Sequence, residues 1–154
     1  MKQVTQLLKI ALFDCWMANE DRNINNANLL YDIENQNIVS IDYGCIFNTA
    51  TFEYPISQLT STDTILYSDL FQHLMHGRNR ADIQWEMETL RMEYNKCVDR
   101  SQRQIGFIIQ SLPPQWNISQ SLMERKLLEL FGSQWIDSVW KNFVELLNDN
   151  VQDG

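Results

Sequence analysis

Two short extended runs interrupt a chain of 154 residues in which apolar side chains otherwise recur mainly at helical spacing. The runs are NLLY at residues 28–31 and IVSID at residues 38–42, and the segment DIENQN between them contains Asp and Asn residues that favour turns. The pattern therefore predicts one β-hairpin near the N-terminus. Because an isolated two-stranded hairpin is only marginally stable in water, it must pack on helices or pair with a partner.

Helical periodicity dominates the remaining sequence. Apolar residues lie three and four positions apart over residues 3–18 and again over most of residues 62–148. The expected helices of the second part cover residues 64–76, 79–98 or beyond, 104–112, 121–131 and 133–147. The Pro113-Pro114 pair is expected to end the third of these helices. We therefore expect one domain over residues 1–154, of the α+β class and mainly α.

The composition indicates a soluble protein with a core of its own. Hydrophobic residues make up 44% of the chain, which is enough for a sizeable buried core at this length. Acidic residues outnumber basic ones by 20 to 12, so the chain would repel the phosphates of a nucleic acid, and no nucleic-acid partner is expected.

The expected location is the cytoplasm. No apolar run approaches the roughly 20 uncharged residues that span a bilayer, and the apolar N-terminal stretch leads into no small-residue cleavage site, so we expect neither export nor a membrane partner. Cys15, Cys45 and Cys97 match neither a disulfide framework nor a zinc site and are expected to be reduced thiols.

Polar side chains gather where the two predicted strands enter and leave the hairpin. Asp21 precedes Asn26 by five positions, and Asp42 closes the second extended run before Tyr43 and Gly44. If the strands pair, these groups meet at one end of the hairpin. Two adjacent carboxylates repel each other unless a proton, a basic neighbour or a divalent cation relieves the repulsion. Oxygen ligands of this kind suit Mg²⁺ and the transfer of a phosphoryl group.

The segments ALFDCWMANEDRNINNANLL and IVSIDYGCIF resemble the catalytic core of HipA-like kinases and, more distantly, that of phosphatidylinositol-kinase-like enzymes. The segment LPPQWNIS at residues 112–119 is similar to the same group, though less closely. The resemblance is strong over residues 11–47. It implies that residues 43–61, which mix Gly, Pro, Thr and Ser with single aromatics, form an irregular, activation-segment-like region and that residues 62–148 form a helical C-terminal kinase lobe.

The resemblance also implies roles for individual residues. Asp21 matches the catalytic Asp that receives the proton of the acceptor hydroxyl. Asn26 and Asp42 match the residues that hold Mg²⁺ and, through it, ATP. Arg22 and Asn28 fall within the matched loop and are expected to support its shape.

Half of the nucleotide site has no counterpart in this sequence. A complete kinase has a preceding lobe with a Gly-rich loop and a strand Lys, whereas the five glycines here are scattered and the lysines lie in predicted helices. We therefore expect the N-terminal lobe to be absent, and ATP to bind only together with a protein partner that supplies it. This would make the chain one part of a split serine/threonine or small-molecule kinase. The alternatives are a non-catalytic interaction module, such as an adaptor, inhibitor or regulatory subunit, and a truncated gene product.

Each feature also has a simpler interpretation when it is taken alone. Asp21-Arg22 is compatible with an ion pair at a helix end, the asparagines are common turn formers, and Asp42 could merely end a strand. His73 and His76 lie three apart in a predicted helix but have no nearby carboxylate to complete a metal site. The ordered combination of helix, Asp-Arg, Asn, hairpin and Asp-x-Gly favours the kinase hypothesis. The acceptor and the oligomeric state stay open.

Overall fold

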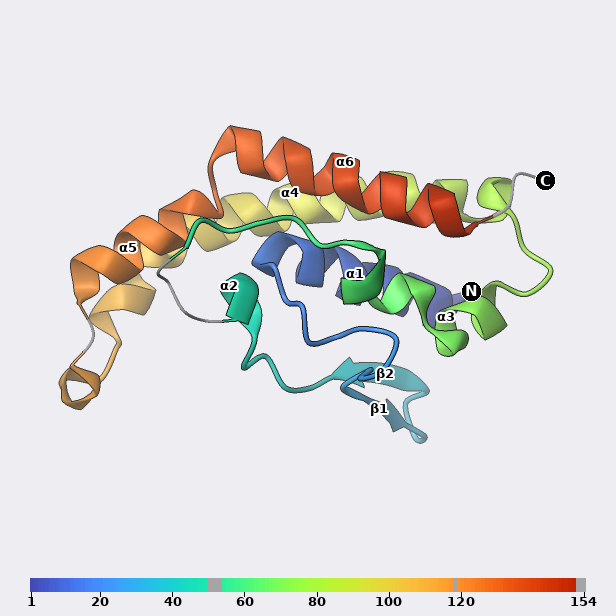
Figure 1. The fold of residues 1–154 in the computed structure, drawn as a ribbon, viewed down its shortest axis with the longest axis horizontal. Coiled ribbons are helices and arrows are strands. Elements are labelled where there is room, and N and C mark those ends of the chain that lie inside the picture. Colours follow the sequence, from blue (N-terminus) through green and yellow to red (C-terminus); the bar gives the residue numbers. More distant parts are fainter. Residues whose placement is uncertain (50–53, 118, 152–154) are drawn as a thin grey trace.

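The computed structural model describes residues 1–49, 54–117 and 119–151 and shows a mainly helical protein with one β-hairpin (Figure 1). The predicted class, α+β and mainly α, is confirmed. The helices of the described chain are α1 (Lys2–Met17), α2 (Ile46–Thr49), α3 (Asp69–Met75), α4 (Arg80–Gln110), α5 (Gln120–Glu129) and α6 (Ser133–Asn150). The strands are β1 (Leu29–Asp32) and β2 (Asn37–Ser40), and 3₁₀ turns lie at Ser61–Asp63, Ile65–Tyr67 and Pro114–Trp116.

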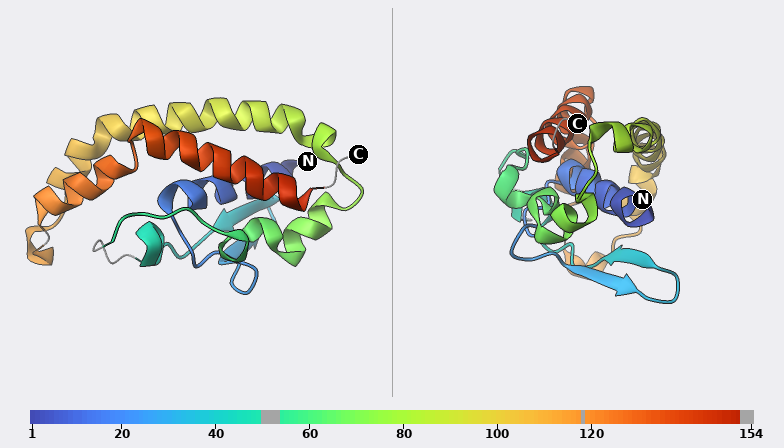
Figure 2. Two further views of the ribbon diagram at one scale, coloured as in Figure 1. Left: turned by 45° about the horizontal axis from the view of Figure 1, so that its top comes forward. Right: turned by 90° about the vertical axis from the view of Figure 1, so that its right-hand side faces the viewer.

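Helix α1 lies at the centre of the molecule, between the layer of α4 and α6 and the hairpin (Figures 1 and 2). Its apolar residues recur every three or four positions and are almost fully buried: Val4, Leu7, Leu8, Ala11, Leu12, Cys15 and Trp16. The same core includes Phe143 and Leu147 of α6 and Phe71 near the start of α3. Burial of a large apolar side chain contributes about 1.5–3 kcal/mol, so this core anchors α1 and the loop that follows it.

The hairpin packs on α1, as the marginal stability of an isolated hairpin requires. Its strands pair in antiparallel register, with Leu30 opposite Val39. Gln6 of α1 meets β2 directly: its Oε1 accepts from the backbone N–H of Ile38 at 3.0 Å, and its Nε2 donates to Oδ1 of Asn37 at 2.8 Å. One side chain of the central helix thus sets the position of the second strand.

Two predicted helix boundaries are wrong for local reasons. The helix expected over residues 64–76 begins only at Asp69, because Ser68 adopts an extended conformation and its hydroxyl accepts from the N–H of Phe71 at 3.2 Å. The helices expected over 79–98 and 104–112 are one continuous helix, α4, because no proline interrupts them and Gly106 is tolerated within the helix. As predicted, α4 ends before the Pro113-Pro114 pair.

Helix α4 has 31 residues and is about 46 Å long at 1.5 Å per residue. Together with α5 it extends past the end of α1 as an arm (Figures 1 and 2). The segment expected to be irregular, residues 43–61, contains the short α2 and ends at Ser61, where the first 3₁₀ turn begins, and residues 50–53 lie outside the described part. None of the described helices is both long enough and apolar enough to cross a membrane.

Candidate active site

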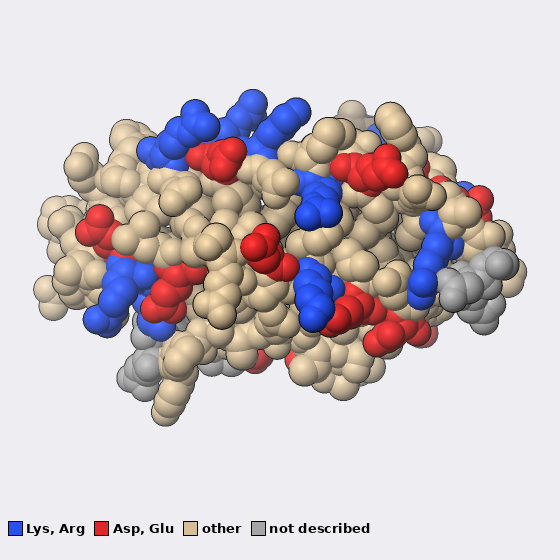
Figure 3. All heavy atoms as spheres, turned by 90° about the horizontal axis from the view of Figure 1, so that it is seen from above, with Lys and Arg blue, Asp and Glu red and all other residues tan. Residues whose placement is uncertain are grey.

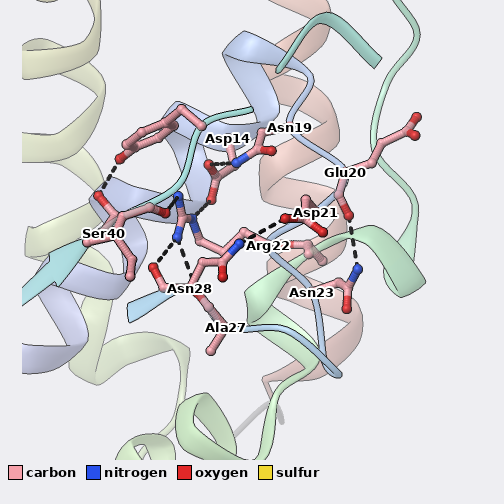
Figure 4. A network of polar contacts seen from close by, with 12 residues as sticks. Asp14, Asn19, Glu20, Asp21, Arg22, Asn23, Ala27, Asn28 and Ser40 are labelled. Atoms are coloured by element: carbon pink, nitrogen blue, oxygen red, sulfur yellow. Dashed lines mark hydrogen bonds and ion pairs between the residues drawn. The ribbon is translucent and has the colours of Figure 1, made fainter. Parts of the chain in front are cut away.

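Arg22 is the residue around which the candidate site is built (Figure 4). Its side chain is fully buried, and its Nε donates to Oδ2 of Asp14 in α1 at 2.8 Å. Its Nη1 donates to the carbonyl oxygens of Ala27 at 3.2 Å and Asn28 at 2.5 Å, and its Nη2 donates to that of Ile41 at 3.1 Å. One guanidinium therefore joins α1, the loop before β1 and the segment after β2.

Asp14 is the anionic partner of Arg22 inside the core. It is 1% exposed, and its Oδ1 accepts from Nδ2 of Asn19 at 2.9 Å. Burial raises the pKa of Asp14 to about 6, although the charge of Arg22 and the hydrogen bonds from Asn19 and Arg22 favour the carboxylate. Sequence reasoning missed this residue. The sequence did contain a sign of it, because Asp14 lies among the apolar positions of α1, and a carboxylate is rarely buried without a partner.

Asp21, the predicted catalytic residue, is half-buried at the start of the loop. Its Oδ2 accepts from Nδ2 of Asn28 at 2.9 Å, while its Oδ1 accepts no hydrogen bond from any described residue. Asn28 has a left-handed backbone conformation, φ 46°, which Asn adopts more readily than most residues. The amide of Asn28 therefore orients the carboxylate and leaves one oxygen of Asp21 available for a proton.

Asp42, a predicted metal ligand, is exposed and lies two residues beyond the end of β2, so the prediction that it closes the strand is wrong. Ile41 lies between the end of β2 and Asp42, and its N–H donates to the carbonyl oxygen of Asn28 at 2.9 Å. Asp42 has φ 55°, and its Oδ1 accepts from the N–H of Gly44 at 3.1 Å. A Cβ at Gly44 would lie 3.3 Å from that oxygen, which explains in part why glycine suits this position.

The ring of Tyr43 closes the site over Arg22. It lies 4.9 Å from the guanidinium carbon and packs edge-on against Phe13 of α1 at 5.5 Å between ring centroids. Its hydroxyl shares a hydrogen bond with the hydroxyl of Ser40. The residues on both sides of Asp42 in the chain are therefore held, Ile41 by its hydrogen bond to Asn28 and Tyr43 by its packing on Arg22 and Phe13.

Asn26, the other predicted metal ligand, lies in a tight loop with Asn23. The two residues exchange backbone hydrogen bonds, N–H of Asn23 to O of Asn26 at 3.0 Å and N–H of Asn26 to O of Asn23 at 3.3 Å. The Asn26 side chain is half-buried and hydrogen-bonded to none of the described residues. Its neighbour Ala27 contacts Arg22, so Arg22 holds the three segments that carry Asp21, Asn26 and Asp42.

Asn48 is a second residue that sequence reasoning missed. It lies in α2 with φ 47°, and its backbone N–H donates to the carbonyl oxygen of Ala18 at 2.8 Å. Its side-chain amide donates to the carboxylate of Glu20 and accepts from the N–H of Ser57 at 2.6 Å. Asn48 thereby connects the loop beside Asp21 to Ser57, near the end of the segment of residues 43–61. No sequence motif marked it, because its role depends on three segments that are far apart in the chain.

The donor set has the chemistry that Mg²⁺ requires. Two carboxylates and an amide oxygen are hard oxygen ligands, and Mg²⁺ is commonly held by one or two carboxylates, with water and substrate phosphates in its remaining positions. The described residues contain no cluster of three or more His, Cys, Asp or Glu side chains that could hold a metal ion by themselves.

Comparison with known families gives a match that covers most of the chain. The family model described as HipA-like kinase matches residues 2–134, which includes the whole candidate site and all but the last helix. No curated protein and no solved structure matches the chain.

Proposed function

This chain belongs to the HipA-like kinase family, and we propose that it supplies the base and metal-binding half of a phosphotransferase site. In this proposal Asp21 accepts the proton of the acceptor hydroxyl, and Asn26 and Asp42 hold Mg²⁺. The metal would bridge the phosphates of ATP and neutralise the charge that develops on them during transfer. The acceptor is a hydroxyl of a protein or a small molecule.

The buried guanidinium of Arg22 is the observation that carries the proposal. A solvated turn at a helix end needs no buried ion pair, and burying two charges costs several kcal/mol before their attraction is counted. Here the pair of Asp14 and Arg22 is buried. The Nε of Arg22 donates to Asp14, its Nη1 to two backbone carbonyls and its Nη2 to a third. This arrangement fixes the loop and the segment after β2 relative to each other, which is the preorganisation that transfer chemistry requires.

Exposed apolar side chains on the outer face of the hairpin support the proposal that a partner lobe binds this chain. Leu30 and Val39 are cross-strand neighbours and are 57% and 45% exposed, and Ile41 beyond them is 39% exposed. Contiguous apolar side chains beside polar ligands are common where a cofactor or a second domain binds. We propose that a separate polypeptide provides the nucleotide-covering lobe and docks here, and that the chain binds ATP only in that complex.

The test is Mg·ATP binding and phosphate transfer, measured with this chain alone and then with the product of an adjacent gene. We expect Asp21→Asn and Asp42→Asn to lower the transfer rate of the complex by roughly 10²–10⁴-fold. Asp42→Asn should also weaken nucleotide binding in the presence of Mg²⁺ but not in its absence. The matched control is Glu34→Gln, which removes an exposed carboxylate from the turn of the same hairpin and should change neither quantity.

A non-catalytic module, the second candidate function, predicts a different result. The partner would bind equally well to the wild type and to the Asp21→Asn and Asp42→Asn variants, and no nucleotide would bind to either preparation. The catalytic proposal should be abandoned if that result is obtained and Asp42→Asn has no effect in the cell.

A further inference from the structure

Helix α4 carries an unusual row of exposed side chains on the face that points away from the core. We call this row the outer stripe of α4, and it consists of Trp85, Met92, Lys96, Arg100, Arg103 and Phe107. Trp85 and Phe107 are each 74% exposed and Met92 is 56% exposed, values that are high for side chains of this size. The stripe therefore exposes large apolar groups that the fold itself leaves uncovered.

Helical geometry places these residues in one line. Successive spacings of seven, four, four, three and four residues keep them within about 40° of a single direction on a helix of 3.6 residues per turn. The buried residues of α4 lie on the opposite side: Ile83, Leu90, Tyr94, Val98, Ile105 and Ile109. Trp85 and Phe107 are 22 positions apart, or about 33 Å along the axis. The stripe is thus long enough to contact a helix of six turns.

The centre of the stripe is basic in a chain of formal net charge −8. Lys96, Arg100 and Arg103 are exposed, and only Asp99 among residues 96–103 carries a negative charge. None of the three makes an ion pair or a side-chain hydrogen bond with a described residue. Arg91, one turn earlier, is already engaged, because its guanidinium lies 5.5 Å from the ring of Trp140. Seen from above, basic side chains gather along the upper edge of the molecule in the picture (Figure 3).

The charge pattern argues against a second copy of the chain as the occupant. An antiparallel twofold pairing of two outer stripes, which would bring each Trp85 to the Phe107 of its mate, would be centred on Lys96. In that pairing Lys96 would face the Lys96 of the other copy, Arg100 would lie opposite Met92, and Arg103 opposite Thr89. No basic residue of the stripe would therefore meet a carboxylate of the stripe, and the two Lys96 charges, directly opposite, would be destabilising. A complementary surface instead needs carboxylates in its middle and apolar groups at its ends.

We propose that the outer stripe of α4 docks an acidic amphipathic helix of another protein. In this complex the apolar side chains of the partner cover Trp85 with Met92 at one end and Phe107 at the other, and its carboxylates lie along the three basic residues between them. Aromatic anchors with Arg beside them are the composition expected of a binding surface. This surface is distinct from the hairpin face assigned to the nucleotide-covering lobe, because α1 lies between α4 and the hairpin (Figure 2).

The experiment uses a synthetic helical peptide of roughly 25 residues, with Leu along one face and Glu on both flanks of that face, and the whole chain. We expect saturable binding, a blue shift of tryptophan emission that Trp85→Phe removes, and weaker binding at higher salt. Reversal of the three charges, Lys96→Glu with Arg100→Glu and Arg103→Glu, should weaken binding at least roughly tenfold. Phe107→Ala should weaken it as well.

The matched control reverses three exposed basic residues outside the stripe, Arg78→Glu with Arg125→Glu and Lys141→Glu, and should bind like the wild type. Circular dichroism would verify that each variant is folded. The proposal is overturned if the peptide does not bind, if a Lys-flanked peptide binds equally well, or if the stripe and control variants lose affinity equally. It is also overturned if the wild-type chain dimerises through the stripe, or if the stripe binds vesicles containing phosphatidylserine but not the peptide.

Discussion

The two sides of the loop that carries Asp21 use their polar groups in opposite ways. Beneath the loop, Asp14, Asn19 and Arg22 are buried and bind one another and the backbone. Above it, Asp42 is exposed and the hairpin presents uncovered apolar side chains such as Leu30. The buried network has hydrogen-bond partners for all nitrogens of Arg22 and for both oxygens of Asp14, although Oδ1 of Asn19 has none among the described residues. The upper side, by contrast, keeps oxygens and apolar surface available. The lower side therefore serves as a scaffold, and the upper side is where ligands and partners can add contacts.

The largest predicted effect comes from removing the centre of the scaffold. Arg22→Met deletes the partner of a buried carboxyl and removes the donor to the carbonyls of Ala27 and Ile41, so we expect a loss of about 3–5 kcal/mol in the free energy of unfolding, measured by urea denaturation. The double variant Asp14→Leu with Arg22→Met should recover part of this loss. Lys141→Met, which breaks an exposed ion pair with Glu145, is the control and should change little. A small effect of Arg22→Met would mean that the lower side is no scaffold.

The second prediction concerns the pH dependence of the same scaffold. Burial places the pKa of Asp14 at about 6 in the folded state, above its ordinary value of 3.8, so the folded protein holds this proton more tightly than the unfolded chain does. The contribution of protonated Asp14 to the free energy of unfolding is fully present below pH 3.8 and is lost as the pH rises through 6. Relative to Asp14→Asn, the wild type should lose roughly 1.4 kcal/mol of unfolding free energy for each unit of difference in pKa, or about 3 kcal/mol.

Urea denaturation of both proteins between pH 4 and pH 7 measures this difference. A difference that stays constant with pH, or that grows in favour of the wild type as the pH rises, would contradict it. The second outcome would mean that the attraction of Arg22 for the carboxylate exceeds the cost of burial.

A third prediction tests the connection from the scaffold to the segment beyond α2. Asn48→Gly keeps the left-handed backbone but removes the amide that contacts Glu20 and Ser57, and should cost about 1 kcal/mol. Asn48→Ala adds a penalty of roughly 1–2 kcal/mol for a left-handed residue with a Cβ. Equal stabilities of the two variants, compared by thermal or urea unfolding, would show that the backbone conformation at Asn48 carries no cost.

The smallest effect is one of reactivity rather than stability. Cys15 of α1 is buried, and burial raises the pKa of its thiol. Cys45, three residues after Asp42, is half-buried, and Cys97 is exposed. Since the thiolate is the reactive form, iodoacetamide should label Cys97 and Cys45 in the folded protein and Cys15 only after unfolding. Mass spectrometry of peptides resolves the three sites. Rapid labelling of Cys15 in the native protein would show that the lower side opens readily.

Much of the fold could be predicted from local pattern. The helical period of residues 3–18 and the paired extended runs predicted α1 and the hairpin, since such periods report which face of an element is buried. The Pro113-Pro114 pair marked the end of α4 for an equally local reason. The start of α3 was missed, because the hydroxyl of Ser68 competes with the helix for the backbone in a way that spacing alone does not reveal.

The sequence by itself also determined the family, because the Asp-Arg, Asn and Asp-x-Gly spacing carries the kinase resemblance and the family match agrees with it. Only the tertiary structure decided how these residues are held. The contacts of Arg22 reach across 19 positions to Ile41, and Asn48 reaches across 28 positions to Glu20. Such partners are chosen by the packing of α1, the hairpin and α2 against one another. No local spacing in the chain encodes which buried carboxylate or carbonyl will lie within reach of a given donor.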